Sequence, residues 1–240
     1  YSDYARVLYS GGFVLSYFVT YAAHYIPAAR IIESELIALR LLALVVAGWA
    51  VAAQWRKSRT MAVLVLAAAH LTIFISGPGP RSAFAIVLLS GAAAFFLLWN
   101  RWYYVAAVGL FGSYLNQTFW MIHSAGRNLP LDFWIGLGFL SAHFAVFALA
   151  DLFAREEIRR HTVPTWFRSL FLSFNSAAFL LLSSALVARF AFTQGHHDVL
   201  YFTFAGVLIA LGLSYLRVQR GDPIYNAYLT KGVAVLTLGL

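Results

Sequence analysis

The chain contains no cysteine, and this absence excludes several kinds of chemistry at once. Without a thiol it has no disulfide, no thiolate nucleophile, no cysteine-ligated zinc site and no cysteine-bound iron–sulfur cluster. Common catalytic motifs are missing as well: the sequence holds no HExxH, no GxSxG, no Walker A loop and no complete GxGxxG. The sequence therefore contains no catalytic motif that would indicate an enzyme.

Charge is also scarce. Only 11% of the residues are charged and 62% are hydrophobic, whereas soluble domains are about 25% charged. The apolar residues form continuous runs of about 20 residues, the length that one helix needs to cross a bilayer. Because these runs do not alternate between polar and apolar residues, they favour helices over the strands of a membrane barrel.

We predict an all-α polytopic transmembrane bundle with eight full spans and the start of a ninth. The spans are 5–26, 35–55, 60–77, 82–99, 102–122, 133–153, 167–190 and 198–216, with the ninth beginning near residue 228. The turns at Arg56–Arg59 and Asn100–Arg101 are very short, so the spans on either side of them form antiparallel hairpins.

The basic residues predict an orientation. Lys and Arg number 17 against 9 acidic residues, a net charge of +8. Twelve of the 17, among them Arg168 and Lys231, fall on one predicted side of the membrane and five on the other. The positive-inside rule places Tyr1 in the cytoplasm, and the pattern is typical of a bacterial inner membrane. Because the charges lie between apolar runs, we expect no nucleic-acid partner.

The two ends of the chain lead to a further expectation. The sequence opens at Tyr1 without methionine and stops inside the apolar run 232–240. We expect residues 1–240 to be one transmembrane domain that is a piece of a longer protein.

Acidic residues are absent from the middle of the predicted spans. Proton-coupled carriers usually place Asp or Glu near the midplane of the membrane. Asp151 comes closest, at the end of the sixth span. There it precedes Arg155 by four residues, a spacing that predicts an ion pair on one helix face.

Two histidines lie near the middle of predicted spans, His70 in the third and His143 in the sixth. Both fall at a similar predicted depth, and neutral imidazole is a good axial ligand for a haem or related pigment. The alternative is that each histidine donates a hydrogen bond to a neighbouring helix. The sequence requires no cofactor.

Amide side chains also occur within the spans, at Asn116, Gln117 and Asn175. The default interpretation is a hydrogen bond to a neighbouring helix. Close helix contacts are further predicted by small residues spaced four apart, which begin at Gly109, Gly138 and Gly206.

Histidines on the non-cytoplasmic side suggest a second kind of site. His123, His196 and His197 could ligate zinc or copper together with nearby carboxylates. They come from separate loops or span ends, and only the His196–His197 pair is closely spaced. The alternative is that these histidines are solvated loop residues.

The segments Gly11–Pro27 (GGFVLSYFVTYAAHYIP) and Arg101–Tyr114 (RWYYVAAVGLFGSY), with the basic turn between them, resemble one family. This family comprises large bacterial multi-pass membrane proteins catalogued only as a domain of unknown function. The likeness covers about residues 5–120. It implies many tandem spans in a much longer chain and supplies no catalytic residues.

The leading hypothesis is an integral membrane protein that serves as a non-catalytic structural or accessory subunit of a larger complex. Its partners would be membrane lipids and other membrane subunits. One alternative is a transporter or lipid-handling protein, and a second is a haem- or pigment-binding subunit that uses the intramembrane histidines.

Overall fold

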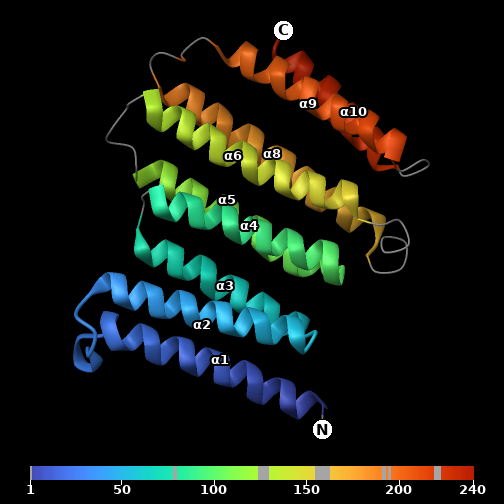
Figure 1. Cartoon of the computed structure of the whole chain (residues 1–240). Helices are drawn as coiled ribbons and strands as arrows, with labels where there is room; N and C mark the ends of the chain where they lie inside the picture. The colour runs from blue at the N-terminus through green and yellow to red at the C-terminus, as the bar shows by residue number, and fades with distance from the viewer. Residues whose placement is uncertain are drawn as a thin grey trace. The chain divides into compact units, whose positions relative to one another are not determined.

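The computed structural model describes residues 2–77, 80–123, 130–154, 163–190, 193, 196–218 and 223–240. Within these ranges every regular element is a helix and no strand occurs, which confirms the predicted all-α class (Figure 1). The chain divides into two compact units, Tyr1–Trp120 and Met121–Leu240. Each unit is described by itself, and a single domain over 1–240 stays a prediction.

The helices of the described ranges match the predicted apolar runs to within a few residues. The first five are α1 (Ser2–Tyr25), α2 (Glu35–Trp55), α3 (Arg59–Ser76), α4 (Pro80–Asn100) and α5 (Tyr103–His123), with a short 3-10 helix η1 (Pro27–Ala29) after α1. The last four are α6 (Pro130–Phe153), α8 (Thr165–Arg189), α9 (His197–Val218) and α10 (Ile224–Leu238). The largest difference is the start of α10 at Ile224 rather than near 228.

Six of these helices are long and apolar enough to cross a membrane. They are α2, α3, α4, α6, α8 and α9. Helices α1 and α5 have sufficient length, but they are rich in tyrosine and other polar side chains. Helix α10 has only 15 residues, and about 20 are needed for a full crossing.

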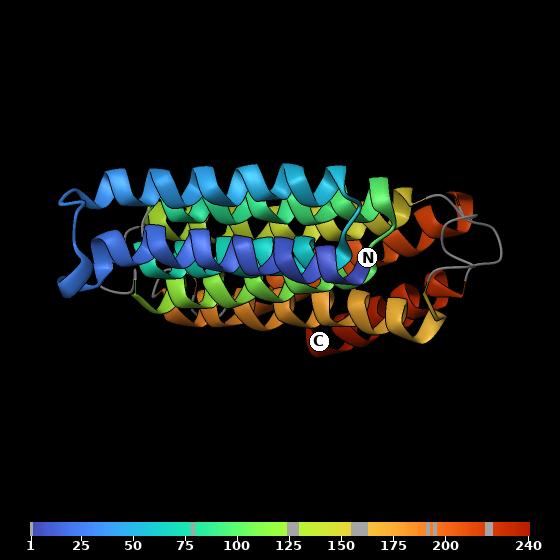
Figure 2. The same cartoon turned by 90° about the horizontal axis from the view of Figure 1, so that it is seen from below.

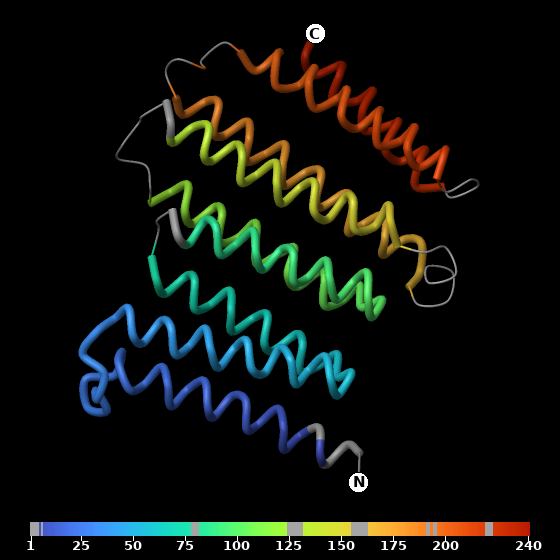
Figure 3. Tube along the Cα trace, in the orientation of Figure 1, coloured from blue at the N-terminus to red at the C-terminus, as the bar shows by residue number. Residues whose placement is uncertain are grey.

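Short turns join α2 to α3 and α4 to α5, as the sequence predicts (Figure 3). The first turn closes with Lys57 at φ 51°, and the Ser58 side chain accepts a hydrogen bond from the Met61 backbone N–H as the N-cap of α3. The side chains of Gln54 and Asn100 are hydrogen bonded to each other. Both turns therefore lie at the same end of the first unit.

Helix α1 runs alongside α2 (Figure 2). Side-chain hydrogen bonds join it to α2 and α3. The Trp49 indole N–H donates to Ser16 Oγ at 3.0 Å. The Tyr17 hydroxyl lies 2.9 Å from Thr72 Oγ1 and 3.2 Å from the Ala68 carbonyl oxygen. These bonds set the register of α1 against its neighbours.

Glycines on α5 allow close packing against α3 and α4. A Cβ at Gly109 would overlap the Cβ of Ala93, and a Cβ at Gly112 would lie 2.6 Å from Cγ of His70. One turn beyond Gly109, Ser113 Oγ lies 2.8 Å from Ser90 Oγ. The spacing that begins at Gly109 thus marks a helix contact, as predicted.

The other two predicted small-residue contacts are not found. Among the described residues, nothing lies within 4 Å of where a Cβ would stand on Gly138 or Gly206. Helices α9 and α10 instead meet at Gly212, which faces Leu229, and at Gly232, which faces Ile209. Spacing alone does not tell which face of a helix is covered.

Aromatic side chains form part of the core of the second unit. The Phe144 ring of α6 lies 5.1 Å from that of Phe179 on α8 and 5.3 Å from that of Phe204 on α9, centroid to centroid. The Phe179 and Phe204 centroids are 4.6 Å apart. Such ring pairs add to the stabilisation from burial alone.

Candidate functional site

A buried ion pair joins α6 to α8 in the second unit. Arg168 Nη2 donates to Asp151 Oδ2 at 2.7 Å, and Arg168 Nε donates to Oδ1 at 3.1 Å. Asp151 is 0% exposed and Arg168 only 4%. Both carboxylate oxygens are therefore engaged by one guanidinium in the bidentate arrangement that Arg and carboxylates favour.

The ion pair continues into a cluster that includes α9 and α10. The Tyr215 hydroxyl donates to Asp151 Oδ2 at 2.7 Å, and its ring stacks on Tyr228 with centroids 5.2 Å apart. Lys231 Nζ lies 5.2 Å from the centre of the Tyr228 ring, a cation–π distance. We call these five residues the Asp151 cluster.

The Asp151 cluster was only partly foreseen from sequence. The predicted partner of Asp151 was Arg155, which lies outside the described residues, whereas the structure pairs Asp151 with Arg168. Its position between two apolar runs groups Arg168 with the basic residues that predict orientation, yet the structure buries it in the first turn of α8. The sequence does contain a signal for this ion pair: Asp151 lies in the last turn of one helix, and Arg168 lies in the first turn of the next long helix.

The interactions of the Asp151 cluster join helices to one another. Both oxygens of the Asp151 carboxylate are already engaged, since Arg168 and Tyr215 donate three hydrogen bonds to them. Buried ionisable groups in membrane helices are costly and persist when they are paired. The cluster ties the end of α6 to α8 and α9.

His70 contributes to packing between α3 and α5. Its Nδ1 lies 3.2 Å from Asn116 Nδ2, and the same amide donates to the Gly112 carbonyl oxygen at 3.0 Å. The imidazole lies against Gly112, where Nε2 would be 2.8 Å from a Cβ. The imidazole ring therefore packs closely on α5 at Gly112, and its Nε2 is buried without a hydrogen-bond partner among the described residues.

The other buried polar side chains have different surroundings. Asn175 on α8 donates to the Phe144 carbonyl oxygen of α6 at 3.1 Å, an interhelical bond of the expected kind. Gln117 is 0% exposed, and neither of its amide atoms has a hydrogen-bond partner among the described residues. His143 is buried in α6, in the second unit, whereas His70 belongs to the first.

The histidines proposed as metal ligands lie at helix ends. His123 is the last residue of α5, and His196 precedes His197, the first residue of α9. The His197 ring lies 6.3 Å from the Tyr201 ring. In the part of the chain that the structure describes, no three His, Asp or Glu side chains gather to hold a metal.

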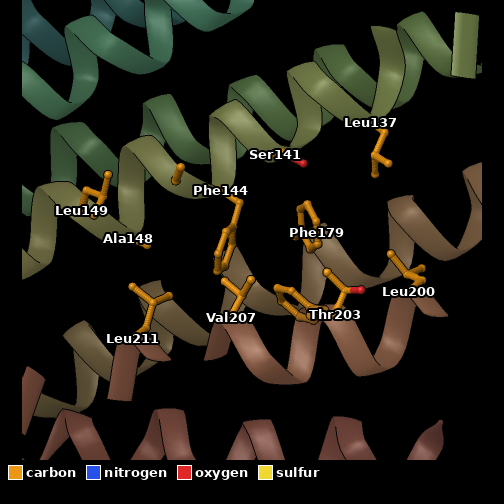
Figure 4. Close-up of a pocket in the computed structure, with 12 residues that line it drawn as sticks. Leu137, Ser141, Phe144, Ala148, Leu149, Phe179, Leu200, Thr203, Val207 and Leu211 are labelled. Atoms are coloured by element: carbon orange, nitrogen blue, oxygen red, sulfur yellow. The ribbon is translucent and has the colours of Figure 1, made fainter. Parts of the chain in front are cut away.

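Apolar grooves lie beside the helices of each unit. In the second unit, side chains of α6, α8 and α9 surround a groove of about 360 Å³ (Figure 4). Ser141 and Thr203 are its polar residues, and the Thr203 hydroxyl donates to the Val199 carbonyl of its own helix. A second groove, of about 330 Å³, lies along α2, α3 and α4 in the first unit. Neither groove is lined by Asn116, Gln117 or Asn175.

The long apolar helices define the class of this protein: it is an integral membrane protein of the polytopic helical kind. No protein-family model, curated protein or solved structure matches the chain. The assignment of a function therefore depends on the geometry described above.

We expect Asn175→Ala to destabilise the second unit by about 0.6–2 kcal/mol, because it removes an interhelical amide bond inside the membrane. The matched control is Asn226→Ala, which removes an amide from the exposed side of α10 and should change stability by less than about 0.5 kcal/mol. Unfolding in mixed micelles by titration with SDS measures both. Equal losses would show that the Asn175 bond has no special role.

Proposed function

We propose that this protein is a non-catalytic structural or accessory subunit of a larger membrane complex, with lipids and helices of other subunits as its partners. One observation carries the proposal: several buried polar groups within the helices join one helix to another. Asn116, Asn175 and the Asp151 cluster all serve this purpose. Such groups hold a bundle together and leave its outer surface for contact.

The outer faces of the helices support the same proposal. Leu15, Val51 and Leu181 are 64%, 67% and 70% exposed, and apolar side chains of this kind suit hydrocarbon or a partner helix. Four tryptophans at helix ends are exposed as well, whereas Trp102 and Trp120 are buried. The exposed four are Trp55, Trp99, Trp134 and Trp166, and exposed tryptophan at span ends is typical of the membrane interface.

The topology is part of the proposal. Helices α1 and α5 are taken as additional crossings, which makes eight spans, and α10 as the start of a ninth. The distribution of Lys and Arg supports a cytoplasmic Tyr1 and a bacterial inner membrane. The resemblance of residues 5–120 to a family of multi-pass bacterial proteins agrees with this arrangement.

A second candidate function, lipid handling, is favoured by the groove between α6, α8 and α9. Its walls are almost entirely apolar, and Phe144 and Phe179 extend into it (Figure 4). A groove of this composition suits an acyl chain. Bulky substitutions at Ala145 or Ala148, which line it, would lower the amount of co-purifying lipid if this function is correct.

The test of the leading proposal is purification of the full-length protein in native nanodiscs, followed by mass spectrometry. We expect partner subunits in fixed stoichiometry that are missing from an unrelated polytopic protein prepared in the same way. A monodisperse protein without any partner would contradict the proposal.

The same sample tests the cofactor alternative through its visible absorption spectrum. A pigment band that disappears in the His70→Ala or His143→Ala variant would establish that alternative. A sample with neither a band nor bound metal would rule out both the pigment site and the metal site proposed at His123, His196 and His197.

A further inference from the structure

We infer that α1 and α2 form a binding site for one acidic glycerophospholipid, with its phosphate at Arg56 and an acyl chain along α2. The inference deepens the proposed function, because it rests on the chain being embedded in a lipid bilayer. It concerns a groove of about 410 Å³ in the first unit. Among the residues that line the groove are Tyr9, Leu44, Gly48, Trp49, Trp55 and Arg56.

The polar end of this groove carries an oriented cation. Arg56 Nη2 donates to the Tyr9 hydroxyl at 2.8 Å, and the guanidinium carbon lies 4.9 Å from the centre of the Tyr9 ring. Arg56 therefore bridges α2 to α1 while remaining exposed. No carboxylate among the side chains that the structure describes pairs with Arg56 (Asp3 is not one of them), so its other N–H groups can bind a phosphate.

The surroundings of Arg56 match the headgroup level of a membrane. Lys57 and Arg59 follow in the same exposed turn, which has no acidic residue. Trp55, at the edge of the groove, is 86% exposed. Basic pockets between transmembrane helices bind anionic headgroups, and exposed tryptophan is enriched at this depth.

The apolar end of the groove follows one face of α2. From Arg56 to Leu44 the helix covers about 18 Å at 1.5 Å per residue. Gly48 lies on this face, and nothing lies within 4 Å of where its Cβ would stand. Trp49 is held across α1 by its bond to Ser16. The groove is therefore elongated and apolar, with a cation at one end. This arrangement matches a lipid that has an anionic headgroup and an apolar acyl chain.

The experiment is native mass spectrometry of the purified full chain with equimolar phosphatidylglycerol and phosphatidylcholine of identical acyl chains. We expect the wild type to retain phosphatidylglycerol preferentially and Arg56→Gln to reduce this preference about five-fold. The matched control is Arg101→Gln, an exposed arginine in the other turn at the same end of the unit, and it should leave the preference unchanged.

Two further arms test the groove itself. Gly48→Leu places a bulky side chain in the groove at an exposed position. This variant should reduce the binding of both lipids. Inorganic phosphate at millimolar concentration should not displace the bound lipid, because it lacks the acyl chain. Displacement would identify an anion site only and overturn the inference.

If the Arg56 and Arg101 variants lose the preference for phosphatidylglycerol equally, the preference reflects general surface charge and the inference is overturned. A wild type that shows no preference would also overturn the inference. These outcomes are separable from the partner test. The lipid site can fail while partner subunits still co-purify, and partners can be missing while Arg56 still selects an acidic lipid.

Discussion

Arg168→Met is expected to destabilise the second unit by about 3–5 kcal/mol, because it removes the guanidinium that binds both oxygens of the buried Asp151 carboxylate. Asp151 is 0% exposed, and two of its three described hydrogen bonds come from Arg168. Methionine keeps the length and apolar stem of the side chain, so the loss reports the charge more than the volume. Titration with SDS in mixed micelles measures the change in unfolding free energy.

A double-mutant cycle separates the pair from its parts. The double variant Asp151→Leu/Arg168→Met should be more stable than the sum of the single losses predicts, because neither member of the ion pair is then left buried without the other. The matched control is Arg217→Met, which removes an exposed arginine from α9 of the same unit and should cost less than about 0.5 kcal/mol. If the losses in unfolding free energy of the two single variants are strictly additive in the double variant, Asp151 and Arg168 do not stabilise the unit through their mutual interaction.

Gly109→Ala is expected to destabilise the first unit by about 1–3 kcal/mol through overpacking against α4. The new Cβ would overlap the Cβ of Ala93, which is attached directly to the helix backbone and cannot turn away. The control is Gly91→Ala in α4, where nothing lies within 4 Å of the Cβ position. Because alanine is the better helix former, this control should be neutral or stabilising by up to about 1 kcal/mol.

A compensating substitution makes the second prediction sharper. Ala93→Gly in the Gly109→Ala background removes the opposing methyl group and should recover most of the lost stability. Thermal unfolding in detergent ranks the four proteins. If Gly109→Ala proves as stable as Gly91→Ala, the two backbones do not approach each other as closely as described.

Parts of the candidate site were within reach of sequence reasoning. An amide inside an apolar run must find a partner, and Asn116 and Asn175 each bond across a helix pair. The bond between Asp151 and Arg168 was not foreseen, because local spacing favours a partner on the same helix. Asp151 and Arg168 are 17 positions apart in the sequence. Whether their helix ends meet depends on how α6 and α8 pack against each other.

The small-residue spacings illustrate the same limit. Three such spacings occur in the sequence, yet only the one beginning at Gly109 lies against a neighbouring helix. Gly138 and Gly206 have open space beside them, and the α9–α10 contact uses Gly212 and Gly232. The spacing shows that a close approach is sterically allowed, but the rotation of each helix about its axis decides whether it happens.

The sequence by itself determined the helical class, the position of the helices and the short hairpin turns, because apolar runs and turn residues act locally. The tertiary structure alone decided which polar groups meet. The Asp151 cluster, the packing of His70 on Gly112 and the groove beneath Arg56 each join residues from different helices. Their energies arise from burial and from contacts across the chain, and no local pattern encodes either.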